Sequence, residues 1–468
     1  MSEPFHPYEY QSKMLEWAAT RDVFSYFVSP GMGKTVVTLK VLEQWMVEGK
    51  SRGALIVAPL RVCSVTWPDQ VERWDHSSWM KVAMLRTPEG MKAWHDGSAD
   101  VYLINFEMLQ SLVPKMFAKG VTVPVDTFIW DELSAAKNPS SKRVKAILPH
   151  LVNFKQVVTL TGTPVANDYQ DLWGEIRIMD GGQRLGKSFF HYRQTFFKSD
   201  FMGYKWEINP GAKDIIDAKL SDICLVMLGD DYLDLPTCNA EDINVTLPPD
   251  ASAEYKRMEK ELLIQLESSE VVALSAATLC GKLLQITSGS VYDDQRGVYH
   301  VHDAKIEALK KLRKKHGKEP MLVLTAYKHE MARVLEAIPG SRRFDEKDLD
   351  DWKAGKIHTW VAQPMSLSHG IDGIQHGGRI AVWMTLTYSN ETYTQTNARL
   401  VRVGQSCETI IYRVVVPGTV DDAVCSALRD KTDTQSGLLQ ALKNLQKMRH
   451  TKSDGQLQSF IDAWKAAP

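Results

Sequence analysis

Short, almost continuous apolar runs recur through the first 160 residues, and stretches with helical periodicity separate them. Runs of this kind are typical of strands that are buried on both faces, as in a parallel sheet covered by helices. They predict strands over residues 23–28, 53–58, 101–106, 125–130 and 156–160. Because ligands of such sheets bind at the carboxyl ends of the strands, the residues that follow each run are the first candidates for chemistry.

A second series of the same kind begins near residue 304, with strands predicted over 321–325, 357–362, 379–384 and 409–416. Between the two series, the periodic α/β pattern fades. We therefore predict an α/β fold with two tandem doubly wound parallel-sheet lobes and a mostly helical insertion between them. The expected domains are an N-terminal lobe over 1–175, an insertion and linker over 176–300, a C-terminal lobe over 301–430 and a helical tail over 431–468.

The first run leads into the segment Ser29-Pro30-Gly31-Met32-Gly33-Lys34-Thr35, and a helical pattern follows it. Strand, glycine loop, Lys-Thr and helix is the setting of a phosphate-binding loop. Gly31 and Gly33 would let backbone N–H groups approach a phosphate at a helix N-terminus. Lys34 would contact the β- and γ-phosphates, and the Thr35 hydroxyl would bind Mg²⁺. The alternative is an ordinary glycine turn, because Val28 occupies the first glycine position of the full pattern.

Acidic and amide side chains stand near the same predicted sheet edge. Asp131 and Glu132 directly follow the run 125–130. A nucleotide hydrolase needs an Asp that holds Mg²⁺ and a Glu that activates water there, although an Asp at this place is also a common helix N-cap. Gln11, upstream of the glycine loop, has an amide that could recognise an adenine edge; taken alone, it fits a surface residue better. The segment Thr161-Gly162-Thr163-Pro164 and Asn167 could couple the site to a second surface or form a simple turn.

Two arginines in the second series form a further candidate. If residues 395–405 are helical, Gln395, Arg399 and Arg402 are four and three residues apart and share one face. Guanidinium groups present planar, permanent donors to phosphate, so a nucleotide held by the first lobe would suit them. Surface salt bridges are the alternative.

Composition limits which cellular compartment and which binding partners the sequence predicts. The formal net charge of −1 over 468 residues gives no overall basic field, so any nucleic-acid surface must be local. Six scattered cysteines without a C-x-x-C pair indicate reduced thiols rather than disulfides or zinc. His300, His302 and Asp303 fit a polar loop better than a metal site. We see no signal peptide and no membrane span, and we expect a monomer in the cytoplasm, either a bacterial cytosol or a virus-infected host cell.

Taken in order, these motifs resemble the Swi/Snf-like ATPases, double-stranded DNA translocases of helicase superfamily two. The resemblance covers about residues 8–428. The segments that carry it are Tyr10-Gln11, Gly31-Met32-Gly33-Lys34-Thr35, Leu55-Ile56-Val57-Ala58-Pro59-Leu60 with Trp67 and Trp74, Asp131-Glu132 with Lys137-Asn138, Leu160 to Asn167 with Leu172-Trp173, Asp234-Leu235-Pro236, and Gln395 with Arg399 and Arg402-Val403-Gly404-Gln405.

The resemblance implies two RecA-like lobes that bind ATP and Mg²⁺ between them and move along double-stranded DNA. It implies catalytic roles for Lys34, Glu132, Arg399 and Arg402. It also implies nucleotide contacts and metal ligands in the first lobe, and a nucleotide contact from Gln395 in the second. The nucleotide and metal contacts of the first lobe are Gln11, Gly31, Gly33, Thr35 and Asp131. Weaker candidates for DNA contact are Arg61, Asn105 and Thr325.

Several positions depart from the family pattern. Ser29-Pro30 replaces the usual Glu-Met, Ser134 replaces a His, and Asp372-Gly373 replaces an Asn-Leu. The basic run that usually precedes Asp234-Leu235-Pro236 is replaced by Gly229-Asp230-Asp231. We expect a minimal bacterial or viral enzyme rather than a chromatin remodeller. The rival functions are a strand-separating DNA or RNA helicase and an ATP-gated DNA-binding module with little turnover.

Overall fold

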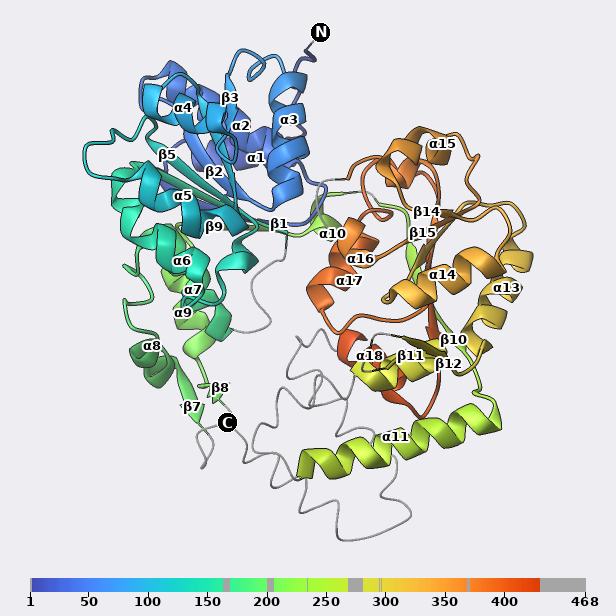
Figure 1. The fold of residues 1–468 in the computed structure, drawn as a ribbon. Coiled ribbons are helices and arrows are strands. Elements are labelled where there is room, and N and C mark those ends of the chain that lie inside the picture. The colour runs from blue at the N-terminus through green and yellow to red at the C-terminus, as the bar shows by residue number, and fades with distance from the viewer. Residues whose placement is uncertain are drawn as a thin grey trace. The chain divides into compact units, whose positions relative to one another are not determined.

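The computed structural model describes residues 2–162, 169–199, 206–233, 235–267, 281–293, 295, 297–367 and 371–429. The chain forms two compact units. The N-terminal unit comprises Met1–Ser199 and Trp206–Asp234, and the C-terminal unit comprises Asp200–Lys205 and Leu235–Pro468. Each contains one large sheet with helices packed on it (Figure 1).

The N-terminal unit is built on a seven-stranded sheet in which every pairing is parallel, in the order β3-β4-β2-β5-β6-β1-β9. The five predicted strands are confirmed, with ends shifted by at most two residues. The two outer strands, β3 and β9, are not predicted by the apolar pattern. The strands are β1 (Val23–Val28), β2 (Ala54–Ala58), β3 (Val82–Met84), β4 (Val101–Asn105), β5 (Thr127–Asp131), β6 (Gln156–Thr161) and β9 (Cys224–Met227).

Both faces of this sheet are buried, as the continuous apolar runs predict. Along β2, Leu55 and Val57 belong to one apolar cluster and Ile56 to another, because successive side chains of a strand point to opposite faces. The other strands, the loops and the helices supply the rest of both clusters. The helices of this unit are α1 (Glu9–Ala18), α2 (Lys34–Val47), α3 (Trp67–Arg73), α4 (Pro88–Asp96), α5 (Leu109–Met116), α6 (Lys142–Ile147), α7 (Tyr169–Asp180), α8 (Phe189–Phe196), α9 (Ala212–Leu220) and α10 (Gly229–Tyr232).

The C-terminal unit repeats this plan with six parallel strands, in the order β10-β17-β16-β13-β15-β14. Leu322 and Val323 of β13 again face different apolar clusters. The four predicted strands are confirmed, and the two edge strands β10 and β14 are additional. The strands are β10 (Cys238–Asn244), β13 (Met321–Leu324), β14 (Arg342–Arg343), β15 (Thr359–Ala362), β16 (Ile380–Trp383) and β17 (Thr409–Val415).

Helices cover this second sheet too, which confirms the predicted α/β class with two parallel-sheet lobes. They are α11 (Pro249–Glu267), a helix over 281–288, α13 (Ala304–His316), α14 (Lys328–Ala337), α15 (Leu349–Lys353), α16 (Pro364–Leu367), α17 (Asn390–Asn397) and α18 (Val420–Arg429).

The region between the lobes and the two small hairpins complete the fold. Within 176–300, predicted as a mostly helical insertion and linker, β9 joins the first sheet and β10 the second. The antiparallel hairpins are β7 (Phe197–Ser199) with β8 (Trp206–Ile208), and β11 (Ser290–Tyr292) with β12 (Val298–His300). The predicted tail over 431–468 lies outside the described residues.

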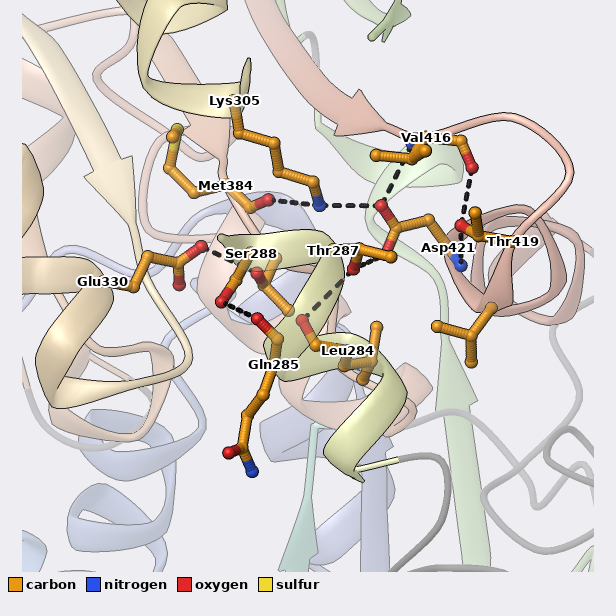
Figure 2. A network of polar contacts seen from close by, with 12 residues as sticks. Leu284, Gln285, Thr287, Ser288, Lys305, Glu330, Met384, Val416, Thr419 and Asp421 are labelled. Atoms are coloured by element: carbon orange, nitrogen blue, oxygen red, sulfur yellow. Dashed lines mark hydrogen bonds and ion pairs between the residues drawn. The ribbon is translucent and has the colours of Figure 1, made fainter. Parts of the chain in front are cut away.

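A buried polar network joins the helices of the C-terminal unit (Figure 2). Lys305 Nζ on α13 lies 2.7 Å from Asp421 Oδ2 on α18 and donates to Met384 O at 2.9 Å. Thr287 Oγ1 donates to the other oxygen of Asp421 at 2.9 Å. Both charged side chains are at most 3 % exposed, so their pairing is required for their burial. Buried Glu330 on α14 accepts from Thr385 Oγ1 at 2.7 Å in the same region.

Candidate functional site

The glycine loop of the N-terminal unit connects β1 to α2 as predicted. Gly31 and Gly33 have φ angles of 83° and 77°, in the left-handed region that favours glycine. Gly33 is the N-cap of α2, and Lys34 is its first residue. The loop therefore places backbone N–H groups and the positive end of a 14-residue helix at the carboxyl edge of the sheet.

Lys34 lies over this loop, where its ammonium group contacts backbone carbonyls. Lys34 Nζ donates to Val28 O at 2.6 Å and to Ser29 O at 3.3 Å. It also faces the end of the neighbouring strand β6, because a Cβ on Gly162 would lie 3.9 Å from Nζ. The ammonium group thus sits between the ends of two adjacent strands, bound to neutral oxygens that an anion could replace.

Gln11 packs directly against the loop. Its Nε2 donates to Met32 O at 3.3 Å, and its Oε1 accepts from the N–H of Tyr8 at 3.0 Å. The side chain is 4 % exposed, so the interpretation of Gln11 as a surface residue is wrong. A Cβ on Gly33 would lie 2.3 Å from Gln11 Nε2. The backbone angle therefore favours glycine at this position, and a larger residue would also have to displace the end of the Gln11 side chain.

Asp131 is the last residue of β5, and its carboxylate has a partner that the sequence does not reveal. Trp67 Nε1 on α3 donates to Asp131 Oδ2 at 2.9 Å. Burial raises the pKa of Asp131, although the Trp67 hydrogen bond and the charge of Lys34 oppose that rise. A desolvated carboxylate near a phosphate loop suits a cation, and oxygen ligands from Asp131 and Thr35 suit Mg²⁺, which commonly completes its shell with phosphate oxygens and water.

Glu132 has an unusual backbone conformation. Among the described residues it is the single non-glycine residue with a positive φ, at 79°. Its N–H donates to Leu160 O at 3.0 Å, and Trp130 Nε1 donates to its carbonyl at 3.1 Å. Such strain persists where surrounding contacts enforce it, often at functional sites. The position precedes a short 3-10 helix (Leu133–Ala136), but no side-chain cap is formed, so N-capping does not account for Glu132.

The hydroxyl group of Ser134 orients the Glu132 carboxylate. Ser134 Oγ donates to Glu132 Oε1 at 2.8 Å. Serine occupies the position where the Swi/Snf-like pattern usually has histidine, and the sequence alone does not indicate its contact with Glu132.

The arginine segment of the C-terminal unit differs from its prediction. The helix α17 ends at Asn397, so the proposed helix over 395–405 is wrong. The N–H groups of Arg399 and Leu400 bond three residues back, to Thr396 O and Asn397 O. Asn397 Oδ1 accepts from Trp383 Nε1 at 3.0 Å, and Leu400 is fully buried. The chain turns after Asn397 while it keeps these contacts with the core.

The two arginines nevertheless contact the same segment. Arg399 Nη1 donates to Ile371 O at 3.1 Å, and Arg402 Nη1 lies 3.2 Å from Asp372 Oδ1. Gln395 is 7 % exposed, and its Nε2 donates to Glu391 Oε1 at 3.2 Å within α17.

The remaining candidates are placed as follows. Asn105 and Thr325, proposed as DNA contacts, are 4 % and 0 % exposed, so neither side chain is presented at the surface in this structure. Arg61 is partly buried at the start of the short π-helix (Val62–Thr66). The segment from Thr163 to Asn167 lies outside the described residues.

Comparison with known proteins identifies the family. The family model described as the SNF2-related domain matches residues 10–332, more than half of the chain. The chain belongs to the SNF2-related family. The Swi/Snf-like resemblance is thereby confirmed.

Relatives of this SNF2-related protein include small and large proteins. It is 34 % identical over 461 residues to the putative protein p41 of Acyrthosiphon pisum secondary endosymbiont phage 1, covering 94 % of this chain and 99 % of the relative. It is 20 % identical to a SWI/SNF-related matrix-associated actin-dependent regulator of chromatin subfamily A-like protein 1 of Drosophila melanogaster, covering 90 % of this chain and 54 % of that one. It is 21 % identical to an uncharacterized ATP-dependent helicase of Mycoplasma genitalium, covering 91 % and 41 %.

Among solved structures, the SWI2/SNF2 ATPase core of Sulfolobus solfataricus in complex with dsDNA is 18 % identical, with a TM-score of 0.45 and coverage of 91 % of each chain. The chain spans nearly the whole phage relative and about half of the Drosophila one. Family membership supports an ATP-using, helicase-like ATPase in general. No helix in the described part of the SNF2-related chain is both long enough and apolar enough to span a bilayer.

Proposed function

We propose that this protein is an ATP-dependent double-stranded DNA translocase that couples ATP hydrolysis between two RecA-like lobes to movement along DNA. The observation that carries the proposal is the convergence of Lys34, Asp131 and Glu132 in one unit, at the carboxyl ends of β1 and β5, which both pair with β6. A second unit of the same sheet type carries Arg399 and Arg402, and the SNF2-related match includes the first group. The proposed lobes span 1–175 and 301–430.

Lys34 provides the first step, the binding of the ATP phosphates. Its ammonium group donates to the neutral carbonyl oxygens of Val28 and Ser29, and phosphate oxygens can replace these with a gain in charge complementarity. Gly31 and Gly33 permit close approach of the phosphates, and the Gln11 side chain packs against the loop. Gln11 would recognise adenine only after exchanging one of its two present backbone partners.

Asp131 and Glu132 serve the hydrolytic step. Thr35 and Asp131 would hold Mg²⁺, which when bound supplies charge neutralisation to the phosphates. Glu132 orients or deprotonates the attacking water. The strained backbone and the hydrogen bond from Ser134 fix its carboxylate beforehand, which reduces the reorganisation needed during the reaction.

Arg399 and Arg402 make turnover dependent on closure of the lobes. In the proposed closed state they reach the nucleotide and stabilise charge that develops on the transferred phosphoryl group. Gln395 lines the same side of the nucleotide. Duplex DNA bound across both lobes would favour closure, and so link hydrolysis to stepping through a population shift. We further propose a monomer that acts in a bacterial cytosol or a virus-infected cell.

The decisive experiment measures ATP hydrolysis with and without duplex DNA, together with two displacement assays. We expect duplex DNA to stimulate hydrolysis and the protein to displace a triplex-forming strand while leaving the duplex paired. Displacement of a duplex strand would favour the strand-separating helicase instead. ATP binding with no turnover on any nucleic acid would favour the gated binding module.

A matched pair of lysine variants controls this experiment. Lys34→Ala should abolish hydrolysis and displacement together. Lys40→Ala, further along α2 and paired with Glu43 at 2.9 Å, should leave both intact. Equal loss in the two variants would show that the effect arises from damage to the helix and would contradict the assignment of Lys34.

A further inference from the structure

In the C-terminal unit, the backbone that carries the two arginines is fixed to the turn over 371–378. Gln405 Nε2 donates to Gln375 O and to Gly378 O, both at 3.1 Å, and Gln375 Nε2 donates to Val403 O at 3.3 Å. A Cβ on Gly404 would lie 2.7 Å from the His376 ring, so the two segments also pack closely. The arginines therefore have limited freedom in their backbone, and their reach depends on their side chains.

The two arginine side chains have different partners on this turn. Arg399 donates to the carbonyl of Ile371, whereas Arg402 pairs with the Asp372 carboxylate; the charge of Arg399 also acts on Asp372, but less strongly than that of Arg402. The Arg402 side chain is 15 % exposed and that of Asp372 is 67 % exposed. Arg402 thus lies largely within the protein, and its charge is matched by an anion at the surface.

Asp372 is held in place and ionised. Its Oδ1 accepts from the Gly373 N–H at 2.8 Å. Partial desolvation acts to raise the pKa of Asp372, but the charge of Arg402 and the Gly373 N–H together bring it below its ordinary value. At neutral pH the group opposite Arg402 therefore carries a full negative charge.

We propose that Asp372 is a positioning residue that competes for Arg402 with the charge that develops on the transferred phosphoryl group. This inference rests on the proposed function, in which Arg402 stabilises charge on the phosphoryl group. Arg402 can stabilise that charge fully only when it is released from the Asp372 carboxylate, because an arginine–carboxylate pair has little net charge. Asparagine would keep the oxygen acceptor and the Gly373 contact without the negative charge.

The test is the variant Asp372→Asn, measured without DNA. A pair of this partly exposed kind is weak, so we expect kcat for ATP hydrolysis to rise about two- to fivefold. Binding of a fluorescent ATP analogue should stay unchanged, because Arg402 acts on the transition state. Asp350→Asn, on an exposed carboxylate of α15 paired with Lys353, is the matched control and should change neither quantity.

The double variant with Arg402→Ala separates this inference from the proposed function. We expect Asp372→Asn/Arg402→Ala to hydrolyse ATP as slowly as Arg402→Ala alone. If Arg402→Ala alone leaves turnover unchanged, the proposed role of Arg402 fails. If Arg402→Ala is inactive but Asp372→Asn shows no gain, or if the gain persists in the double variant, competition by Asp372 is refuted while the proposed function stands.

Discussion

The two units share an all-parallel sheet with both faces buried, yet they position their candidate residues in different ways. In the N-terminal unit, Lys34, Asp131 and Glu132 stand at or beside strand ends, so the sheet itself places them. In the C-terminal unit, Arg399 and Arg402 follow the end of a helix and are placed by a turn with which they form bonds. A residue at a strand end can be recognised in the sequence from the apolar run beside it. A residue placed by a turn depends on contacts between distant segments, which the sequence does not show.

The charges of the two units are also satisfied differently. Lys34 donates to the carbonyls of Val28 and Ser29, and its charge also acts on Asp131. Arg402 pairs with a carboxylate, and Lys305 forms a buried ion pair with Asp421. The N-terminal lysine is thus hydrogen-bonded to backbone oxygens at a strand end, while these two cations of the C-terminal unit form ion pairs with carboxylates. The following predictions test this contrast, from the largest expected effect to the smallest.

Arg402→Ala should give the largest loss of activity. An arginine that stabilises a phosphoryl transition state contributes about 10³–10⁵-fold in rate, so DNA-stimulated hydrolysis should fall by this order. Binding of a fluorescent ATP analogue should remain mostly intact. Arg342→Ala, on the exposed edge strand β14, is the control and should hydrolyse ATP normally. A normal rate in Arg402→Ala would remove the arginine from the reaction.

Glu132→Gln should abolish most hydrolysis while preserving nucleotide binding. Loss of a positioned general base costs about 10²–10⁴-fold, and glutamine keeps the size and the acceptor for Ser134. The measurement is single-turnover hydrolysis with duplex DNA. Glu89→Gln, an exposed residue in the first turn of α4, should behave as the unmodified protein. Retention of most of the rate would show that Glu132 does not act on water.

Lys305→Met should destabilise the C-terminal unit, because it leaves Asp421 buried without its cation. Breaking one side of a buried ion pair costs about 3–5 kcal/mol in the free energy of unfolding. The transition of this unit in chemical denaturation should therefore move to lower denaturant. Lys311→Met, on the exposed face of the same helix, should have little effect. Adding Asp421→Asn to Lys305→Met should restore part of the stability, and a failure to do so would place the cost elsewhere.

Acid should weaken the C-terminal unit through two buried histidines. Burial lowers the pKa of His302 and of His329 to about 4. In the unfolded chain these two histidines become protonated near pH 6.5, whereas in the folded unit they stay neutral until about pH 4. Stability is therefore present above pH 6.5 and is lost as the pH falls toward 4, by up to about 3 kcal/mol for each histidine. His329→Phe, which can keep the stacking on Tyr327, should reduce the slope in this interval.

The sequence predicts most of the fold because the central strands are buried on both faces, which leaves continuous apolar runs. The edge strand β10 has no such run, since Cys238–Asn244 is largely exposed and polar. The phosphate loop is predicted from neighbouring residues alone. The contacts of Gln11 with Met32, and of Trp67 with Asp131, join residues 21 and 64 positions apart and leave no local pattern. The last residue of α17 likewise has a partner from another element, because Trp383 Nε1 of β16 donates to Asn397 Oδ1.

One contact of the phosphate loop extends beyond the nucleotide site. Ser29 Oγ accepts from the N–H of Gly229 at 2.9 Å, and Ser29 N donates to Met227 O at 3.1 Å. Residues 227–229 belong to the last stretch of chain before the N-terminal unit ends at Asp234. The residue that opens the loop and the outgoing backbone are thus direct neighbours. A change in the loop would therefore reach the chain that leaves the N-terminal unit through two hydrogen bonds, one of them made by the Ser29 side chain.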